Sequence, residues 1–216
     1  MRYIDKIGVE LEGGWEEKPE GLRPDASVYI SNSNYVGEIS SIPFGNIKEL
    51  RKWLFKNYPK KVNNTCGLHI HISLKNVLLY SKVMTKEFHK YVKNSIIDFI
   101  NVTKLDAEDK DNLIKRIKGC NRFCGDSFRA DEQVIQEYKE TCRYTHINYC
   151  FSLHGTIEFR ILCMFKSKHN ALKFIKVIIK CVNEYLKKVV KEKEELVVQN
   201  VFEEDKNEKI IIEEMV

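Results

Sequence analysis

Apolar and polar residues alternate in several short segments of the chain, and an alternation of period two predicts β-strands. These segments cover residues 3–12, 27–31, 35–41, 66–74, 142–151 and 156–164. Between and after them, apolar residues recur with helical spacing over residues 47–57, 85–102, 106–118 and 169–191. Strands therefore surround a helical middle and precede a closing helix. This order predicts an α+β fold with mostly antiparallel strands.

The bulk composition is that of one globular domain. The chain has 216 residues, of which 43% are hydrophobic, enough for a sizeable core. Its net charge of +5 hides an asymmetry, because residues 192–216 carry nine acidic and three basic side chains. We predict a domain over residues 1–191 followed by an acidic C-terminal tail over residues 192–216.

Three features predict a cytosolic (cytoplasmic) protein without a membrane partner. No stretch approaches the roughly 20 consecutive apolar residues that a membrane span requires. The N-terminal residues Met1–Asp5 become polar too early for a secretory signal. The seven cysteines are odd in number and scattered, so we expect reduced thiols.

The predicted strands place residues with metal-binding or anion-binding side chains on shared faces. Side chains two positions apart in a strand point to the same side. The residues grouped in this way, strand by strand, are Glu10 and Glu12; Glu38; His69, His71 and Ser73; and Thr156, Glu158 and Arg160. A solvent-exposed face in a chain so rich in lysine should itself carry lysine. We therefore predict a binding site on these strands.

The donor set of this site favours a hard or borderline divalent cation. Four glutamates exceed what one zinc ion needs, and they suit two or more Mg²⁺ ions, with Mn²⁺ as an alternative. Arg160 shares a face with Glu158, where a guanidinium could hold a phosphoryl group. The residues thus outline a phosphoryl-transfer site. Zinc stays open as a competitor, because His-x-His is common in hydrolases and deaminases.

Several motifs resemble those of the glutamine synthetase superfamily. The segment Gly67–Leu74 (GLHIHISL) resembles its His-x-His-x-Ser strand, Glu10-x-Glu12 its paired metal glutamates, and Glu158-Phe-Arg160 its Glu-x-Arg pair. Further segments make the chain most similar to the compact amidoligase family. They are Asp25-Ala-Ser27, Gly37-Glu38-Ile-Ser-Ser-Ile-Pro43 and Arg143-Tyr144 with Asn148.

This resemblance implies a fold and a set of residue roles. The fold would be a curved, mostly antiparallel sheet packed with helices, as in the glutamine synthetase catalytic domain, within residues 1–191. One metal would be held by Glu10, His69 and Glu158, and another by Glu12 and Glu38 with Asp25. The residues His71, Ser73, Arg143 and Arg160 would face ATP, and His71, Arg143 and Arg160 would take part in catalysis.

The reaction that the resemblance implies is ATP-dependent and Mg²⁺-dependent joining of a carboxylate to an amine. The substrate carboxylate would attack the γ-phosphate to give an acyl phosphate, and an amine would then displace phosphate. The substrates would be small molecules or peptides. The chain departs from the family pattern at Ala26, where the family has glycine, before Phe44, where a second proline is missing, and after Arg160. These departures bear on substrate contacts more than on the metal centre.

Three other functions remain open on sequence grounds. They are a metal-dependent hydrolase that uses the His-x-His strand, a non-catalytic basic binding protein, and a guanidino kinase. We expect no nucleic-acid partner, because the chain has no helix-turn-helix, zinc-finger or aromatic ribonucleoprotein motif. Among the remaining histidines, His89 is predicted to lie on a helix surface. His146 shares a strand face with Tyr144 and Asn148, which makes it a candidate for lining the cleft.

Overall fold

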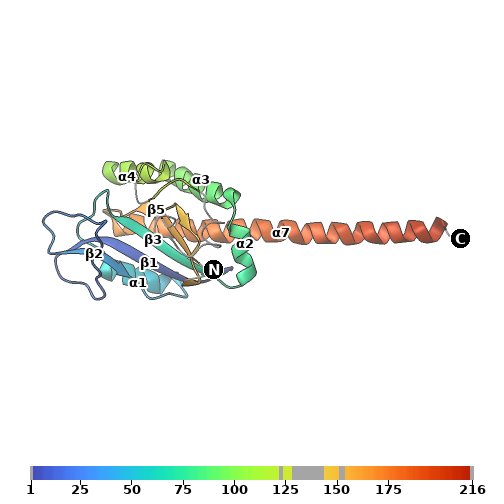
Figure 1. Cartoon of the computed structure of the whole chain (residues 1–216), viewed down its shortest axis with the longest axis horizontal. Helices are drawn as coiled ribbons and strands as arrows, with labels where there is room; N and C mark the ends of the chain where they lie inside the picture. Colours follow the sequence, from blue (N-terminus) through green and yellow to red (C-terminus); the bar gives the residue numbers. More distant parts are fainter. Residues whose placement is uncertain (1, 122–123, 128–143, 151–153, 215–216) are drawn as a thin grey trace.

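The protein has an α+β fold built on a five-stranded antiparallel sheet (Figure 1). The computed structural model describes residues 2–121, 124–127, 144–150 and 154–214, and their side chains up to residue 192. The strands lie in the order β2-β1-β3-β5-β4. Their bounds are β1 Ile4–Trp15, β2 Tyr35–Ser40, β3 Gly67–Leu74, β4 Ile147–Asn148 and β5 Ile157–Cys163. The helices are α1 Ile47–Asn57, the short pair η1 Val77–Leu79 and α2 Tyr80–Val83, α3 Lys86–Val102, α4 Ala107–Ile117 and α7 Lys168–Glu214.

The α+β class and the antiparallel pairing confirm the prediction from the pattern. The predicted strand over 27–31 is wrong, because a turn forms there. Asp25 Oδ1 accepts a hydrogen bond from the backbone N–H of Ser27 at 2.7 Å, and the Asp25 carbonyl accepts one from Val28 at 3.2 Å. An aspartate that bonds its own backbone two residues on favours a turn over a strand.

Helix starts follow the capping signals in the sequence. The Asn46 side chain accepts hydrogen bonds from the first turn of α1, and Thr85 and Asp106 do the same for α3 and α4. Such caps satisfy backbone N–H groups that have no partner within the helix. The short helical segment η1–α2 has too few residues for a periodic pattern, and the sequence analysis missed it.

The hydrophobic core joins the apolar residues of the sheet to buried residues of α1, α3, α4 and α7. Phe88 of α3 packs edge-on against Phe159 of β5, with ring centroids 6.3 Å apart. Phe165 stacks on Phe174 of α7 at 4.7 Å. Because these apolar side chains fill the core on one face of the sheet, the alternate residues of the strands, which carry the carboxylates and imidazoles, lie on the opposite face.

Helix α7 is longer than the predicted 169–191, because it runs through the acidic tail to Glu214. Its C-terminal part extends beyond the body that contains the sheet (Figure 1). In the described part of the chain, no helix has both the length and the apolar character needed to cross a membrane. The six cysteines within the described residues are all free thiols, as predicted.

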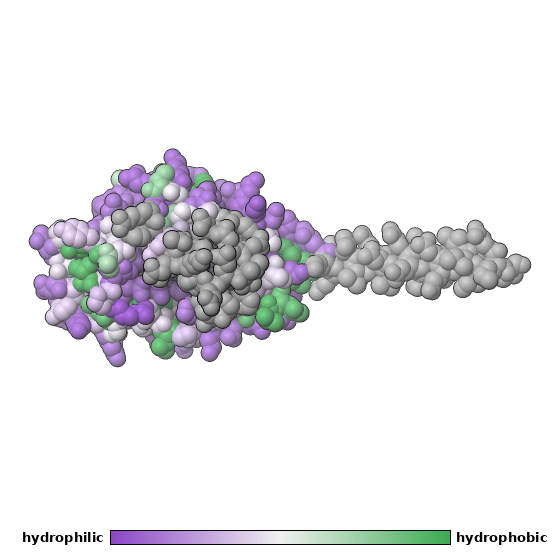
Figure 2. Space-filling model, in the orientation of Figure 1, coloured by the Kyte–Doolittle hydropathy of each residue, from purple (hydrophilic) through white to green (hydrophobic). Residues whose placement is uncertain are grey.

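The surface of the body is mostly hydrophilic on the face drawn in Figure 2. Large apolar side chains with high exposure are few among the described residues, and Ile42, Leu78 and Val102 are examples. Scattered exposed apolar residues of this kind are normal.

Candidate functional site

The strand register brings the predicted ligand residues together on one face of the sheet. Glu10 of β1 lies directly opposite His69 of β3, and Glu12 lies opposite Glu38 of β2. His71 lies opposite Glu158 of β5. Directly opposed residues in an antiparallel sheet have side chains within contact distance. Four neighbouring strands therefore contribute to one cluster.

His69 lies at the centre of this cluster and is 1% exposed. Its Nδ1 atom is 3.2 Å from Glu10 Oε2 and 3.5 Å from Glu158 Oε1, and its Nε2 atom is 3.5 Å from Glu12 Oε1. The residues that the resemblance assigns to one metal, Glu10, His69 and Glu158, thus lie together.

His71, which is two residues after His69 and on the same face of β3, lies near two of the same glutamates. Its Nε2 atom is 3.4 Å from Glu10 Oε1 and 4.0 Å from Glu158 Oε1. This atom is buried and makes no hydrogen bond within the described residues. Ligand atoms of Glu10, His71 and Glu158 all lie within 4.8 Å of one another, which is close enough for one cation.

Glu158 links the cluster to Arg160. Its Oε1 atom accepts a hydrogen bond from Arg160 Nη1 at 2.6 Å, and its Oε2 atom accepts one from Asn148 Nδ2 at 2.7 Å. The Arg160 guanidinium also lies over the Tyr144 ring, at 5.7 Å from its centroid. Its buried Nε atom has no hydrogen-bond partner among the described residues. Glu158 therefore fixes the guanidinium while one of its donors stays available.

A second carboxylate group lies beside the first. Ligand atoms of Glu12, Asp25 and Glu38 lie within 4.8 Å of one another, and so do those of Glu10, Glu38 and His69. The Asp25 turn described above brings this loop residue to the edge of the sheet. Because Glu10 and Glu38 each belong to more than one group, the cluster can hold adjacent cations with shared ligands.

The charges and the burial within the cluster shift the pKa values of two of its glutamates in opposite directions. Burial raises the pKa of Glu10, but hydrogen bonds and charges from His69 and His71 outweigh it and hold that pKa far below the ordinary value. Burial and the charges of Glu10 and Glu12 raise the pKa of Glu38 to about 7. Glu38 therefore ionises at a higher pH than an ordinary glutamate does.

His71 has the opposite shift. Burial lowers its pKa, but interactions of the ring with Cys150 and Glu10 and the nearby carboxylate charges raise it to about 10. A proton on His71 balances part of the negative charge of the glutamates, as a divalent cation would.

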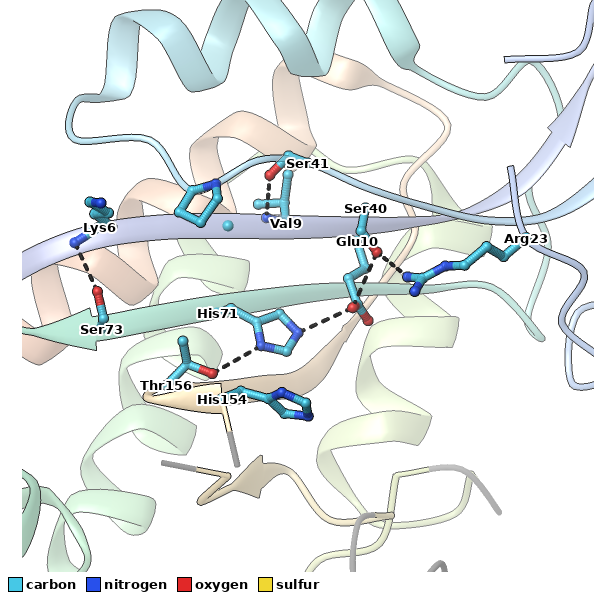
Figure 3. A pocket seen from close by; sticks show the side chains of 12 residues that line it. Lys6, Val9, Glu10, Arg23, Ser40, Ser41, His71, Ser73, His154 and Thr156 are labelled. Atoms are coloured by element: carbon cyan, nitrogen blue, oxygen red, sulfur yellow. Dashed lines mark hydrogen bonds and ion pairs between the residues drawn. The ribbon is translucent and has the colours of Figure 1, made fainter. Parts of the chain in front are cut away.

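The cluster opens into a cleft of about 510 Å³, shown in Figure 3. His71, Glu10 and Arg23 point into it from different elements. Other lining residues include Lys6, Ser73, His154 and Thr156. His71 Nδ1 lies 3.3 Å from the hydroxyl of Thr156. The cleft lies next to the carboxylates, where a ligand could share cations with them.

No family model, curated protein or solved structure matches this chain. The case for a metal centre therefore depends on the residues themselves. Glu12 and Glu158 are 3% and 5% exposed, and buried carboxylates require pairing or a cation. Oxygen ligands in excess, with the buried imidazole of His69 among them, fit Mg²⁺ or Mn²⁺.

Two predicted site residues do not join the cluster. Arg143 lies outside the described residues, so its predicted role stays a prediction. Ser73 lines the cleft, but its hydroxyl accepts a hydrogen bond from the backbone N–H of Lys6 at 3.1 Å rather than contacting the carboxylates. The other predicted residues all lie in or next to the cluster.

Sequence reasoning missed Arg23 and assigned no role to Asn148. The Arg23 Nη2 atom is 2.7 Å from Glu38 Oε1, and it also donates to Ser40. No pattern could have indicated Arg23, because it reaches the site from a loop. Asn148 could have been found by pairing the last two strands, since it lies opposite Glu158.

Proposed function

We propose that this chain is an ATP-dependent and Mg²⁺-dependent carboxylate–amine ligase of the amidoligase type. The observation that supports it best is the cluster of four glutamates and two histidines on one face of neighbouring strands, in which Arg160 binds Glu158 and a cleft is lined by Glu10 and His71. This combination provides several oxygen ligands for cations and one fixed guanidinium for an anion. Phosphoryl transfer between two anionic reactants needs both.

The residues divide into a part that would hold metal and a part that would hold phosphate. Glu10, His69 and Glu158 offer ligands for one Mg²⁺, and Glu12, Glu38 and Asp25 offer ligands for another. When bound, Mg²⁺ would neutralise the phosphate oxygens and let a substrate carboxylate approach the γ-phosphate. These ligands come from adjacent strands and one turn, so their spacing is set by the sheet.

Arg160 would bind the transferring phosphoryl group. Glu158 holds Nη1 of the guanidinium at 2.6 Å, and Nε remains an unbonded donor among the described residues. A planar donor set fixed in this way can stabilise charge without reorganising during the reaction. His71, which points into the cleft, would provide a positive charge there. A carboxylate would become an acyl phosphate, and an amine would then displace phosphate to give an amide.

The first test is binding of a non-hydrolysable ATP analogue by calorimetry, with and without Mg²⁺. Wild type should bind the analogue only with Mg²⁺, and Glu158→Gln should weaken that binding at least about tenfold. Glu17→Gln, which removes an exposed glutamate outside the site, is the matched control and should bind as wild type. Circular dichroism checks that Glu158→Gln remains folded.

A positive result leads to a screen of carboxylate and amine pairs for ADP release together with amide formation. Failure of the folded wild-type protein to bind the analogue with Mg²⁺ would refute the ligase. Zinc that co-purifies with such a protein and is lost in His69→Gln would favour the metal-dependent hydrolase, because His69 and His71 are also suitable zinc ligands.

A further inference from the structure

A second group of metal-binding side chains lies away from the carboxylate cluster, between α3 and the residues before β4. His89 is on α3, Asp126 is in the segment 124–127, and His146 directly precedes β4. His89 Nε2 is 3.2 Å from His146 Nδ1, and His146 Nδ1 is 3.2 Å from Asp126 Oδ1. The third separation, between His89 Nε2 and Asp126 Oδ1, is 4.0 Å.

The structure corrects two expectations here. His89 was predicted to lie on a helix surface, but it is 9% exposed, and His146 is fully buried. His146 was a candidate for lining the cleft, yet its ring packs edge-on against His89, with centroids 5.3 Å apart. The chain bends at His146 before β4 begins, so the strand alternation that places Asn148 beside Glu158 does not apply to His146.

The hydrogen bond of His146 to the backbone assigns its tautomer. Nε2 is 2.7 Å from the carbonyl oxygen of Arg116, which can only accept, so Nε2 carries the proton. If the imidazole is neutral, Nδ1 carries no proton, and its lone pair can only accept a hydrogen bond or bind a cation. It faces Asp126 Oδ1 at 3.2 Å, and a carboxylate oxygen is also an acceptor. His89 Nε2 lies 3.2 Å from the same Nδ1 atom, so either a proton on His89 Nε2 or a cation among the three ligand atoms satisfies this lone pair.

The surroundings of His146 oppose a second proton on its ring. Burial is the largest influence on His146 and lowers its pKa; the Arg116 carbonyl and Asp126 raise that pKa, and the charges of Lys93 and Arg116 lower it, with a net lowering. Burial and His146 also lower the pKa of His89, to about 4. Both shifts favour the neutral imidazole, which is the form that binds metal.

Neighbouring groups orient two of the three ligands, His146 and Asp126, as they do around metal sites. The Arg116 carbonyl holds His146 from behind, and Lys93 Nζ binds Oδ2 of Asp126 and leaves Oδ1 directed at the histidines. A backbone carbonyl behind a histidine and a partner on the second carboxylate oxygen are typical of metal ligands. Asp126 is 35% exposed, so the site can be reached from solvent.

We propose that His89, Asp126 and His146 bind a zinc ion. Tetrahedral zinc with ligands at about 2.0–2.1 Å separates its ligand atoms by about 3.3 Å. Two of the three separations, 3.2 Å each, already match. The 4.0 Å separation closes if Asp126, the exposed member, turns slightly toward His89. Two imidazoles and a carboxylate suit zinc better than Mg²⁺, which prefers oxygen ligands.

This site is separate from the proposed ligase centre, because it shares no ligand with the carboxylate cluster. It would tie α3 to the segment that leads into β4. Two imidazoles and one carboxylate leave the fourth position of a tetrahedral ion for water or another donor.

The test is a titration of metal-free, full-length protein with Zn²⁺, in which a second titration with Co²⁺ gives a visible absorption spectrum of the bound metal. Asp126→Asn keeps the shape of an exposed side chain and should lower zinc affinity at least about tenfold. His89→Gln should do the same. His169→Gln, which changes an exposed histidine on α7, is the control and should bind as wild type.

The carboxylate cluster also contains histidines, so His69→Gln separates the two sites. Zinc binding that persists in His69→Gln and weakens in Asp126→Asn supports the proposal, whether or not the protein uses ATP. Zinc affinity in folded Asp126→Asn and His89→Gln equal to that of wild type would overturn it. Loss of all zinc binding in His69→Gln alone would also overturn it.

Discussion

Gly67 is the position where one added methyl group should damage the metal centre most selectively. Gly67 begins β3, and its backbone N–H donates to Oε2 of Glu12. A Cβ atom there would lie 2.5 Å from His69 Nε2 and 3.1 Å from Glu12 Oε2. The backbone conformation at Gly67 is one that any residue can adopt. Gly67→Ala therefore acts through the contacts of the new methyl group with His69 and Glu12, and not through backbone strain.

The size of the effect follows from the geometry. Ordinary contact begins at 3.4 Å, so the difference from 2.5 Å means that the imidazole or the strand must move by about 0.9 Å. Metal sites tolerate deviations of about 0.2 Å in ligand distance. We expect Mn²⁺ affinity to fall at least about tenfold, or about 1.4 kcal/mol. Overpacking a buried site should also lower the free energy of unfolding by about 1–3 kcal/mol.

Gly8→Ala is the matched control. Gly8 lies on the same face of the adjacent strand, and its Cβ would meet only His71 Cβ at 3.7 Å and Ser41 Oγ at 3.8 Å. Calorimetry with Mn²⁺ in the absence of nucleotide should show wild-type affinity for Gly8→Ala and weak binding for Gly67→Ala. Equal Mn²⁺ affinity in the two variants would show that His69 is not a ligand, and the metal assignment would fail.

Three further predictions test the charge, the guanidinium and the packing. Glu38 has a pKa raised from 4.5 to about 7, so its contribution to the stability of the metal-free protein is lost as pH rises through this range. Chemical unfolding should show this loss in wild type and not in Glu38→Gln, whereas thermal stabilisation by Mg²⁺ should increase over the same range. Arg160→Lys keeps the charge but loses the planar fork, so calorimetry should show at least about tenfold weaker binding of the ATP analogue. Tyr58→Phe removes the 2.5 Å hydrogen bond to the Phe165 carbonyl and should lower the free energy of unfolding by about 1 kcal/mol without changing Mg²⁺ affinity.

The sequence predicts the elements of this fold better than it predicts their contacts. Period-two alternation identified β1, β2, β3 and β5, and apolar residues at helical spacing identified α1, α3, α4 and the first part of α7. The segment 27–31 has the same alternation but forms a turn, because the Asp25 side chain bonds the backbone instead. Local pattern cannot rank these competing hydrogen bonds.

For the site, alternation predicts which side chains share a face but not which of them meet across strands. The pairs Glu10 with His69 and His71 with Glu158 depend on register. Register depends on packing of the apolar face and on the irregularity between Leu68 and Ile70. Arg23 depends on the path of a loop, which no period describes. His146 departs from the alternation because a bend precedes β4.

The backbone of Arg160 connects the two proposed metal sites. Its N–H donates to the His146 carbonyl at 2.9 Å, and its carbonyl accepts from Arg116 Nη1 at 3.2 Å. Arg116 in turn holds His146 through its own carbonyl. A zinc ion on His146 would therefore restrain the strand position from which the guanidinium reaches the phosphate.

This connection predicts how loss of zinc affects nucleotide binding. Asp126→Asn should bind the Mg²⁺–ATP analogue several-fold more weakly than zinc-loaded wild type, because Arg160 is less well fixed. Its affinity for Mn²⁺ alone should not change, since the carboxylate cluster shares no ligand with the zinc site. Calorimetry measures both constants. If they fall together, Asp126 acts on the whole sheet, and if neither falls, the two sites are independent of each other.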